Sequence, residues 1–366
     1  MRKLNYFFKK LDWPLIIFAI VLTSFGLIEL YGISLNKGNF LIFKKQIVFF
    51  ILGVSLMFLM GGLMDYRFLK RNRFLILFLY LFICLLLLGV LFFGERIRGM
   101  RGWYRLGDLS FSPTPFMAIA LVLVLAKYFS KYHTEIYRTW HLFFSFVYVF
   151  SPSLLIFLQP DLGSIIGLIL IWLSVIIFSG VKISHFLILL LIFSLIFTFS
   201  WFFLLKDYQK QRIETFLNPR FDPKGISWQV EQSKIAIGEG GILGKGIGKG
   251  GQVHFGFLPE AKTDFIFPAI AEETGFLGVS VFFLFFFLFL FRIIKIGLAS
   301  YDNFSRLFCL GFCMLVLIQT FINIGMSIGI MPVIGIPLPF VSYGGSHLIA
   351  NYIGLGIILS IKRFSS

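Results

Sequence analysis

A short polar stretch that opens directly onto a long apolar run carries the residues best suited to chemistry. Residues 257–278 read F-L-P-E-A-K-T-D-F-I-F-P-A-I-A-E-E-T-G-F-L-G. Five ionisable residues lie within this stretch, namely Glu260, Lys262, Asp264, Glu272 and Glu273. Ionisable side chains at the edge of a hydrocarbon layer are costly to place there and mark candidate functional sites. This stretch is therefore the first candidate for a reactive site.

Asp264 has two roles open to it from the residues alone. Its carboxylate can accept a proton from a substrate hydroxyl, as a general base does. Aspartate is also a favoured N-cap residue, and a helix is predicted to begin at Phe265, which favours the capping role. On a helix, positions 264 and 272 are about 80° apart, so Glu272 could share a face with Asp264. Buried packing or an ion pair between helices is an equal alternative for Glu272 and Glu273.

The composition indicates a protein that uses lipid as its solvent. The chain has 366 residues, of which 58% are hydrophobic, 50 are Phe and 14% are charged, and a soluble protein of this length could not bury so much apolar surface. The net charge of +16 would suit nucleic acid, but the Lys and Arg residues lie mainly in short loops between apolar runs. That placement fits membrane topology and anionic lipid headgroups, and no nucleic acid is expected.

Ten apolar runs are long enough to cross a membrane as helices, at about 20 residues each. The sequence therefore predicts an all-α polytopic membrane protein, with residues 1–366 forming a single domain. The fourth run is short and opens with Pro113 and Pro115. The runs are 13–33, 46–64, 74–93, 113–127, 140–158, 163–180, 184–205, 265–291, 307–328 and 342–361.

The Lys and Arg residues predict the orientation of these spans. With the N-terminus in the cytoplasm, the inside segments carry 17 of them and the short outside loops carry 7. Both termini are therefore expected to be cytoplasmic, and the long loop 206–264 extracytoplasmic. No small-residue cleavage site follows the first apolar run, which is read as an uncleaved span. The three cysteines lie inside apolar runs and are expected to pack there, and the five histidines lack metal-ligand spacing.

The long loop holds a predicted amphipathic helix and a glycine-rich segment. Residues 227–237 form the helix, with Trp228 as an interfacial anchor. Residues 238–251 include 8 glycines, and a G-x-G-x-x-G match among them lacks the strand and helix of a dinucleotide site. Free backbone N–H groups beside Lys245 and Lys249 could receive an anion. An equal alternative is a mobile loop whose glycines occupy positive-φ turns.

Two further segments are candidates for lining a cavity. Prolines and glycine between residues 332 and 339 forbid a continuous helix near the C-terminus, and irregular backbone at membrane depth is tolerated where it is buried or lines a watery cavity. Ser342, Tyr343 and Ser346 could then face a substrate, or could bond the backbone groups that the prolines leave unpaired. Asp161, at the turn between the fifth and sixth spans, could line the cavity or cap the sixth helix.

Three long motifs resemble one family. They are Q-S-K-I-A-I-G-E-G-G-I-L-G-K-G (232–246), F-L-P-E-A-K-T-D-F-I-F (257–267), and the segment from Asn323 to Ser346. Together they resemble the SEDS family, the shape, elongation, division and sporulation proteins. The loop opening Y-Q-K-Q-R-I-E-T-F-L-N-P is more similar to the RodA branch than to the FtsW branch. The resemblance covers essentially the whole chain.

The resemblance implies a peptidoglycan glycosyltransferase of cell wall synthesis and rod-shape elongation. Such an enzyme polymerises lipid II at the outer face of the cytoplasmic (inner) membrane. An acceptor sugar hydroxyl attacks with inversion, and undecaprenyl pyrophosphate leaves. The implied partners are a class B penicillin-binding protein, which is a transpeptidase, and the elongation machinery. No cofactor is implied, although a divalent cation, Mg²⁺ or Mn²⁺, could accompany the pyrophosphate.

The resemblance also assigns residues. Asp264 matches the family's essential aspartate and is the expected general base. Lys262 stands where the family more often has His, and there it would either lower the pKa of Asp264 or bind pyrophosphate. The expected substrate-binding residues are Glu260, Lys262, Arg101, Trp103, Lys245, Gln252, Asp161, Ser342, Tyr343 and Ser346.

The chain departs from the family pattern near the fourth span. The family's Q-P-S-E followed by x-x-K aligns with a register in which the glutamate is Pro115 and the lysine is Ala118. Lys127 lies about 13 Å further along a helix and cannot replace that lysine. Either another cation supplies the missing charge or this copy is less active. The candidates for that cation are Arg98, Arg101, Arg105 and Lys262.

Two other functions remain open at this point. A flippase for lipid-linked precursors would also use discontinuous helices and intramembrane charge. A catalytically weak scaffold for a cross-linking penicillin-binding protein would explain the lost glutamate and lysine. The ionisable residues beyond the topology charges gather at the predicted outer face, which favours an outward-facing active site.

Overall fold

The computed structural model describes residues 11–97, 100–107, 109–132, 139–181, 183–219, 222 and 225–365. Arg98, one of the cations considered above, lies outside these residues. The helices are α2 (Trp13–Lys37), α3 (Leu41–Gly62), α4 (Tyr66–Arg71), α5 (Arg73–Phe93), α6 (Thr114–Lys131), α7 (Thr139–Leu158), α8 (Leu162–Phe178), α9 (Ile183–Phe203), α10 (Asp207–Leu217), α11 (Ile226–Glu239), α12 (Gly251–His254), α13 (Ile266–Leu298), α14 (Asn303–Ile328) and α15 (Gly345–Ser365).

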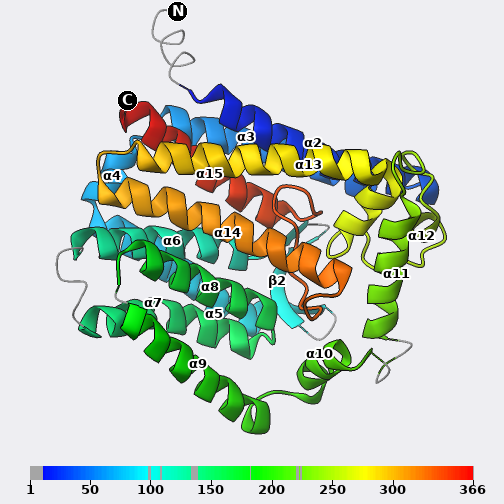
Figure 1. Cartoon of the computed structure of the whole chain (residues 1–366). Coiled ribbons are helices and arrows are strands. Elements are labelled where there is room, and N and C mark those ends of the chain that lie inside the picture. The colour runs from blue at the N-terminus through cyan, green and yellow to red at the C-terminus, as the bar shows by residue number, and fades with distance from the viewer. Residues whose placement is uncertain are drawn as a thin grey trace, which may run out of the picture.

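Each of the ten predicted apolar runs coincides with a helix, and these long helices lie side by side as one bundle (Figure 1). Eight of them are long and apolar enough to cross a membrane. Helix α8 is apolar but shorter, and α15 is not among the eight. The mostly helical, multi-pass architecture is therefore confirmed, whereas the count of ten spans stays a prediction.

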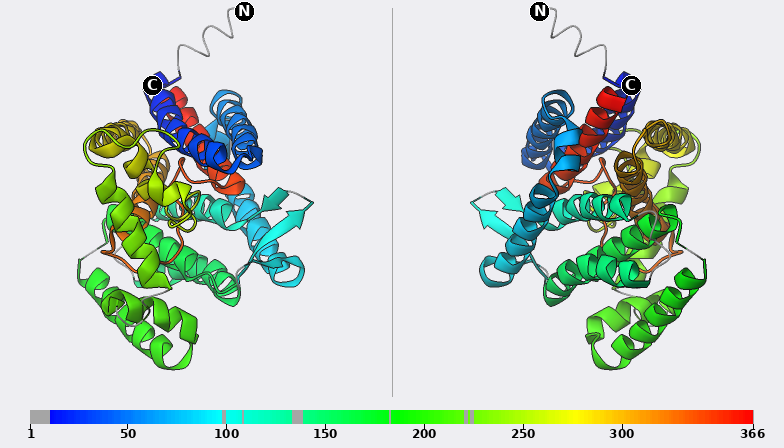
Figure 2. Two further views of the ribbon diagram at one scale, coloured as in Figure 1. Left: turned by 90° about the vertical axis from the view of Figure 1, so that its right-hand side faces the viewer. Right: turned by 90° about the vertical axis from the view of Figure 1, so that its left-hand side faces the viewer.

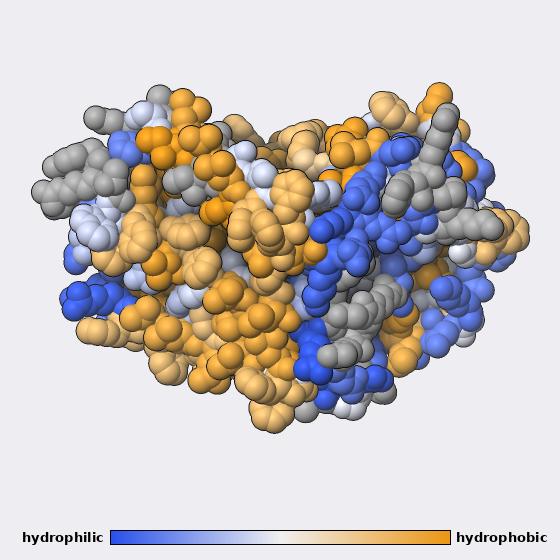
Figure 3. Space-filling model, turned by 90° about the horizontal axis from the view of Figure 1, so that it is seen from below, coloured by the Kyte–Doolittle hydropathy of each residue, from blue (hydrophilic) through white to orange (hydrophobic). Residues whose placement is uncertain are grey.

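The two ends of the described chain lie at the same end of the bundle. Figure 1 shows the start of α2 and the end of α15 together on the left, and the helices of the long loop, α10 to α12, on the right. In Figure 3, apolar side chains form a broad belt, and hydrophilic ones gather toward the right-hand end, where α10 and α11 lie. A belt of this kind is what lipid contact requires of the outer surface.

The first helix begins and ends at recognisable capping residues. Asp12 is the N-cap of α2, and its carboxylate accepts a hydrogen bond from Leu15 N at 3.2 Å. Gly38 ends the helix in the left-handed conformation, which glycine adopts without strain. The Asp12 carboxylate also accepts three charge-assisted bonds from Arg292 on α13, at 2.9 Å, 3.0 Å and 2.7 Å. The start of α2 is thereby fixed to the far end of α13.

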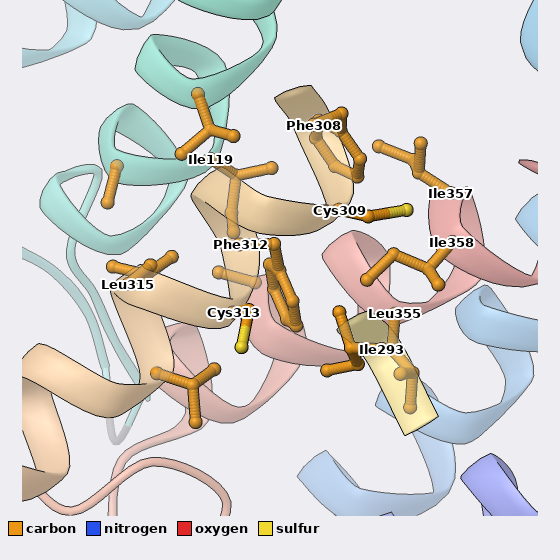
Figure 4. Packing of buried hydrophobic residues seen from close by; sticks show 14 of the residues in the cluster. Ile119, Ile293, Phe308, Cys309, Phe312, Cys313, Leu315, Leu355, Ile357 and Ile358 are labelled. Carbon is orange, nitrogen blue, oxygen red and sulfur yellow. The ribbon is translucent and has the colours of Figure 1, made fainter. Parts of the chain in front are cut away.

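The interior is built from tightly packed apolar side chains of α14 and its neighbours. Within a bilayer, helices associate through close van der Waals packing rather than through the hydrophobic effect. Cys309 and Cys313 are buried and free, as predicted from their place in an apolar run. Figure 4 shows where α6, α13, α14 and α15 meet, through Ile119, Ile293, Phe308, Cys309, Phe312, Cys313, Leu315, Leu355, Ile357 and Ile358.

A small antiparallel sheet was not predicted. Strands β1 (Glu95–Ile97), β2 (Met100–Leu106) and β3 (Leu109–Phe111) pair in the order β1-β2-β3 and project from the side of the bundle (Figure 2). The hydroxyl of Tyr104 on β2 donates to Leu86 O on α5 at 2.7 Å. This bond anchors the sheet to the bundle.

The long outer loop is folded onto the bundle. The predicted amphipathic helix is present as α11, which packs against α13 and α14. Ser233 of α11 is fully buried, and its hydroxyl donates to Ser327 O on α14 at 2.7 Å. A short helix, α12, begins at Gly251, where no helix was expected. The loop therefore covers the end of the bundle at which α13 begins.

Candidate active site

Asp264 lies at the end of a turn that leads into α13. That helix begins at Ile266, and its N-cap is Phe265, which makes no side-chain capping bond. Asp264 therefore lies one residue before the N-cap, and the N-cap position predicted for it is wrong. Its side chain is half-buried.

The carboxylate of Asp264 lies against an irregular C-terminal segment, residues 329–344. Its Oδ2 atom is 3.5 Å from the position that a Cβ atom on Gly335 would occupy. Gly335 has a φ of 75°, a left-handed conformation that other residues adopt with strain. The segment confirms the predicted break between the last two long helices, because α14 ends at Ile328 and α15 begins at Gly345.

Asn323 on α14 fixes this segment to the turn. Its side-chain amide donates to Asp264 O at 2.9 Å and to Ile336 O at 2.8 Å. Asn323 is fully buried, so water cannot replace these bonds. One side chain therefore holds together the two segments that form the site, namely the turn of Asp264 and the irregular segment 329–344.

Ser342 and Tyr343 also bond the irregular segment to the turn of Asp264. The hydroxyl of Ser342 donates to Thr263 O at 2.7 Å and accepts from Leu338 N at 2.8 Å. Tyr343 N donates to Lys262 O at 2.9 Å. For Ser342, which is buried, the structure thus shows the backbone-bonding alternative.

Gln46 on α3 contributes a link that sequence reasoning missed. Its side-chain nitrogen donates to Ser342 O at 3.3 Å, and its oxygen accepts from Gly344 N at 3.3 Å. Gln46 is 1% exposed. A single polar residue near the start of an apolar run was the only signal available in the sequence.

Glu260 shapes the turn that presents Asp264. Its φ is 51°, and its main-chain oxygen accepts from Thr263 N at 3.0 Å and from Phe265 N at 3.2 Å. Its carboxylate accepts from the Thr263 hydroxyl at 3.1 Å. Glu260 therefore positions Asp264 through the backbone, and both belong to the same turn as Lys262, which is half-buried.

The glycine-rich loop pairs with a break in α13. Gly275 has non-helical angles, φ 65° and ψ −168°. On one side of it, Lys245 N and Gly246 N donate to the main-chain oxygens of Glu272 and Glu273, each at 3.0 Å. On the other side, Phe276 N and Leu277 N donate to Gly241 O and Ile242 O, at 2.8 Å and 3.1 Å. Positive φ values at four of the loop's glycines match the alternative of positive-φ turns, and two of the N–H groups considered for an anion are already bonded.

Glu272 is directed into this loop. Its Oε1 atom accepts from Gln252 N at 2.9 Å, and its Oε2 atom lies 2.7 Å from the position of a Cβ on Gly250. The proposed shared face with Asp264 is therefore not how Glu272 is used. Gln252 is buried beside it, with its side-chain oxygen unbonded within the described residues.

Lys245 forms an ion pair with Glu239, the last residue of α11. The hydrogen bond from Lys245 lowers the pKa of the Glu239 carboxyl. Because both side chains are more than a third exposed, this pair is a surface feature of the loop. The predicted substrate-binding residues Lys245 and Gln252 thus belong to the loop that docks on α13.

Asp161 is the N-cap of α8, which is one of the two roles that the sequence left open for it. Its carboxylate accepts from Ser164 N at 3.1 Å and from the Ser164 hydroxyl at 2.6 Å. Burial raises the pKa of Asp161, and the Ser164 bonds and the charge of Arg212 oppose that rise. A Cβ on the nearby Gly163 would lie 2.7 Å from Ile334 O. Asp161 therefore caps a helix whose first turn touches the irregular segment one residue from Gly335.

The predicted arginines of the sheet have partners of their own. Arg101 donates to Leu91 O at 3.0 Å, and Arg105 forms a 3.2 Å ion pair with Glu95. Trp103 lies opposite Glu95 in the ladder and is half-buried. The sheet reaches the site through Ser346, whose hydroxyl oxygen accepts from Ser112 N at 2.9 Å.

Two cations beside the irregular segment were not singled out from the sequence. Arg212 on α10 and Lys234 on α11 line a cavity whose other wall includes Met331, Pro332 and Val333. The cavity has a volume of about 110 Å³. Their basic side chains stand out only once the fold of the long loop is known. At the position of the family's lysine, Ala118 is buried.

No group of three or more His, Cys, Asp or Glu side chains within the described ranges is arranged to hold a metal ion. The residues around Asp264 thus offer no ready-made cage for Mg²⁺ or Mn²⁺. What the arrangement does offer is a half-buried carboxylate whose turn is fixed by buried hydrogen bonds. Arg212 and Lys234, together with Glu231, line a cavity that the same irregular segment borders.

Comparison with known proteins agrees with this arrangement. Residues 12–366 match the model of the FtsW, RodA and SpoVE family, described as cell cycle proteins. The chain is 38% identical to the peptidoglycan glycosyltransferase MrdB of Escherichia coli K12 over 291 residues, covering 78% of this chain and 76% of that one. It is 34% identical to the stage V sporulation protein E of Bacillus subtilis 168 over 362 residues, 97% of each chain.

Solved structures give the same result. A chain from a peptidoglycan synthase complex that coordinates polymerization and crosslinking superposes with a TM-score of 0.82 and 31% identity, over 97% of this chain and 98% of that one. The rod shape determining protein RodA of Thermus thermophilus superposes with a TM-score of 0.72 and 28% identity, over 97% of both chains. From its fold, its assembled C-terminal motif and these matches, the chain belongs to the FtsW, RodA and SpoVE family.

Proposed function

We propose that this chain is a peptidoglycan glycosyltransferase that polymerises lipid II into glycan strands at the outer face of the inner membrane. The observation that carries the proposal is the placement of Asp264. Its carboxylate is half-buried at the end of the bundle covered by the long loop, against a non-helical segment bonded to the same turn. Relatives named peptidoglycan glycosyltransferase support the same activity.

In the proposed reaction, Asp264 is the general base. The oxygen of an acceptor sugar hydroxyl forms a bond to the anomeric carbon of the donor, and its proton passes to the Asp264 carboxylate. The bond from the anomeric carbon to the pyrophosphate oxygen breaks on the opposite side, which inverts the configuration. Undecaprenyl pyrophosphate leaves with the bonding electrons and therefore with the negative charge.

The leaving pyrophosphate needs positive charge. We assign this role to Arg212 and Lys234, which line the cavity beside Pro332 and Val333, together with Lys262 in the turn of Asp264. The sheet arginines Arg101 and Arg105 are less suited, because each already has a partner. This assignment supplies the charge that the family's lysine would have given at the position of Ala118. A divalent cation, if one takes part, would be held largely by the pyrophosphate oxygens.

The orientation and the partners belong to the same proposal. Both ends of the chain are taken to be cytoplasmic, since the start of α2 and the end of α15 lie opposite the helices of the long loop (Figure 1) and the Lys and Arg residues favour that side. The partners are a class B penicillin-binding protein and the elongation machinery. The likeness to a chain of a peptidoglycan synthase complex supports the first of these.

The test is polymerisation of labelled lipid II by the purified chain with its transpeptidase partner. Asp264→Ala and Asp264→Asn should abolish polymer, because neither side chain accepts the proton. Asp65→Asn is a matched control, since Asp65 caps α4 and its carboxylate accepts from Arg67 N at 2.8 Å. Full-length polymer from Asp264→Ala would refute the role of Asp264.

The same experiment separates the other two candidate functions. A scaffold or a flippase would give no polymer from the wild-type chain either. The scaffold remains a candidate because Pro115 and Ala118 stand where the family has glutamate and lysine. Transport of labelled lipid II across vesicles that contain the chain, without polymer, would identify a flippase.

A further inference from the structure

A cavity of about 340 Å³ lies at the other end of the bundle from Asp264, between α5, the last turns of α6 and Tyr148 in the middle of α7. Helix α6 relates the two places. Its first turn follows Ser112, which bonds Ser346, and its last turns carry Lys127 and Lys131. Thirteen residues of helix separate Thr114 from Lys127, a rise of about 20 Å. The cavity is therefore near the opposite surface of the membrane.

Three cations converge on this cavity, namely Arg73 of α5 and Lys127 and Lys131 of α6. Within the described part of the chain, none of the three has a carboxylate at ion-pairing distance. Lys127 donates to the main-chain oxygen of Lys70, and the Lys70 side chain is paired with Asp302 at 3.5 Å. The Asp302 carboxylate is thus already paired with a fourth cation.

The other residues that line the cavity are partly polar and partly apolar, as the parts of a phospholipid are. Tyr128, Tyr132 and Tyr148 bring phenol rings to the cavity, and the Lys131 ammonium donates to the Tyr132 hydroxyl at 3.1 Å. Phe74 and Leu77 line it as well and are 72% and 38% exposed. Basic and hydroxyl groups therefore adjoin exposed apolar side chains that acyl chains can contact.

The bias of Lys and Arg toward one face of a membrane protein explains the number of cations here. It does not explain why three of them share one cavity that no carboxylate of the described residues lines, since charges of one sign repel when they are close together. A bound anion would remove that repulsion. Basic pockets between membrane helices are suited to phospholipid headgroups.

We propose that this cavity binds the phosphate of an anionic phospholipid. Arg73, Lys127 and Lys131 contact the phosphate, and the acyl chains lie along Phe74 and Leu77. Such a site is separate from the proposed reaction at Asp264, and its occupant belongs to the opposite leaflet.

Native mass spectrometry of the full-length chain in detergent tests the proposal, with phosphatidylglycerol and phosphatidylcholine as the probes. The wild-type chain should retain phosphatidylglycerol in preference to phosphatidylcholine. Arg73→Gln and Lys127→Gln should each weaken the retention about fivefold, the effect of one basic residue at a membrane surface. Lys295→Gln is the matched control, because Lys295 lies in the last turn of α13 at the same end of the bundle and does not line the cavity.

If Lys127→Gln also changes the structure by removing the contact with Lys70, Arg73→Gln still tests the proposal. Unchanged retention in both variants would overturn the proposal, as would an equal loss in Lys295→Gln, which would indicate net charge alone. Addition of glycerol 3-phosphate separates the two sources of phosphate. Displacement of the lipid only at a large excess supports a lipid site, and displacement at equal concentration overturns it in favour of a soluble phosphate.

Discussion

The buried amide of Asn323 donates a hydrogen bond to the main-chain oxygen of Asp264 at 2.9 Å. The same amide group donates to Ile336 O at 2.8 Å. A residue near the C-terminal end of a membrane-length helix thus sets the distance between the proposed base and the non-helical segment it faces. The position of the Asp264 carboxylate depends on this helix as much as on its own turn.

Replacement of Asn323 by Ala should therefore lower both stability and polymerisation. Two main-chain acceptors would lose their donor in a place that water does not reach, at about 1–3 kcal/mol for each unsatisfied group. Thermal unfolding in detergent and the rate of lipid II polymerisation measure the two effects. Asn72→Ala is the control, because Asn72 makes no side-chain capping bond at the start of α5. Unchanged unfolding of Asn323→Ala would contradict the role assigned to the amide.

Replacement of Gly335 by Ala should reduce polymerisation with a smaller effect on stability. The new methyl group would stand 3.5 Å from the Asp264 carboxylate, and a φ of 75° adds strain of about 1 kcal/mol. The expected sign is a lower kcat, since the base is displaced or desolvated. Gly238→Ala in α11 is the control, because its Cβ would meet no atom within 4 Å. Equal activity of the two variants would show that the Gly335 contact is unimportant.

Replacement of Arg212 by Gln tests the assignment of the leaving-group charge. Loss of a cation that stabilises the departing pyrophosphate should lower kcat about tenfold or more. Lys210→Gln, on the same helix, removes an equal charge without altering the cavity beside Pro332. If only KM rises in Arg212→Gln, Arg212 binds substrate without acting on the leaving group. If both variants behave like wild type, another cation has the role.

The ion pair of Lys245 with Glu239 predicts a dependence of the loop on pH. The pKa of Glu239 is lowered in the folded chain, so the contribution of the pair is fully present above the ordinary glutamate pKa, about 4.3. It is lost as the pH falls through the lowered value. The protection factors of amides 239–246, that is, their exchange rates relative to those of an unfolded chain at the same pH, should therefore fall at acid pH. In Lys245→Gln this fall should be absent or much smaller, and an identical dependence of the protection factors on pH would contradict the pairing.

The sequence predicted the helices well, because membrane spans depend on long apolar runs that need no distant partner. The segment 227–237 and the break before Gly345 were equally local, signalled by amphipathic spacing and by proline. The sheet was missed since its strands are short and are held to α5 by side-chain bonds, from Tyr104 to Leu86 O and from Arg101 to Leu91 O. A local pattern could not have shown those bonds.

The candidate site was predicted less completely. Asp264 and its turn were found through the resemblance, but the bonds that fix them come from Gln46 and Asn323, far away in the chain. For Glu272, the sequence left a face shared with Asp264 and buried packing as equal alternatives. The structure shows the buried one, in which Glu272 contacts the main chain of Gln252. Arg212 and Lys234 were passed over since only the folding of the long loop brings them beside Val333.

The pairing of the glycine-rich loop with the break at Gly275 has a mechanical consequence. Four main-chain bonds join residues 241–246 to residues 272–277, and their separation at the membrane edge would leave donors and acceptors without partners. These bonds couple the loop to the first part of α13. A force that another protein applies to the exposed loop would therefore be transmitted to the break at Gly275, and through the first turns of α13 to the turn that carries Asp264.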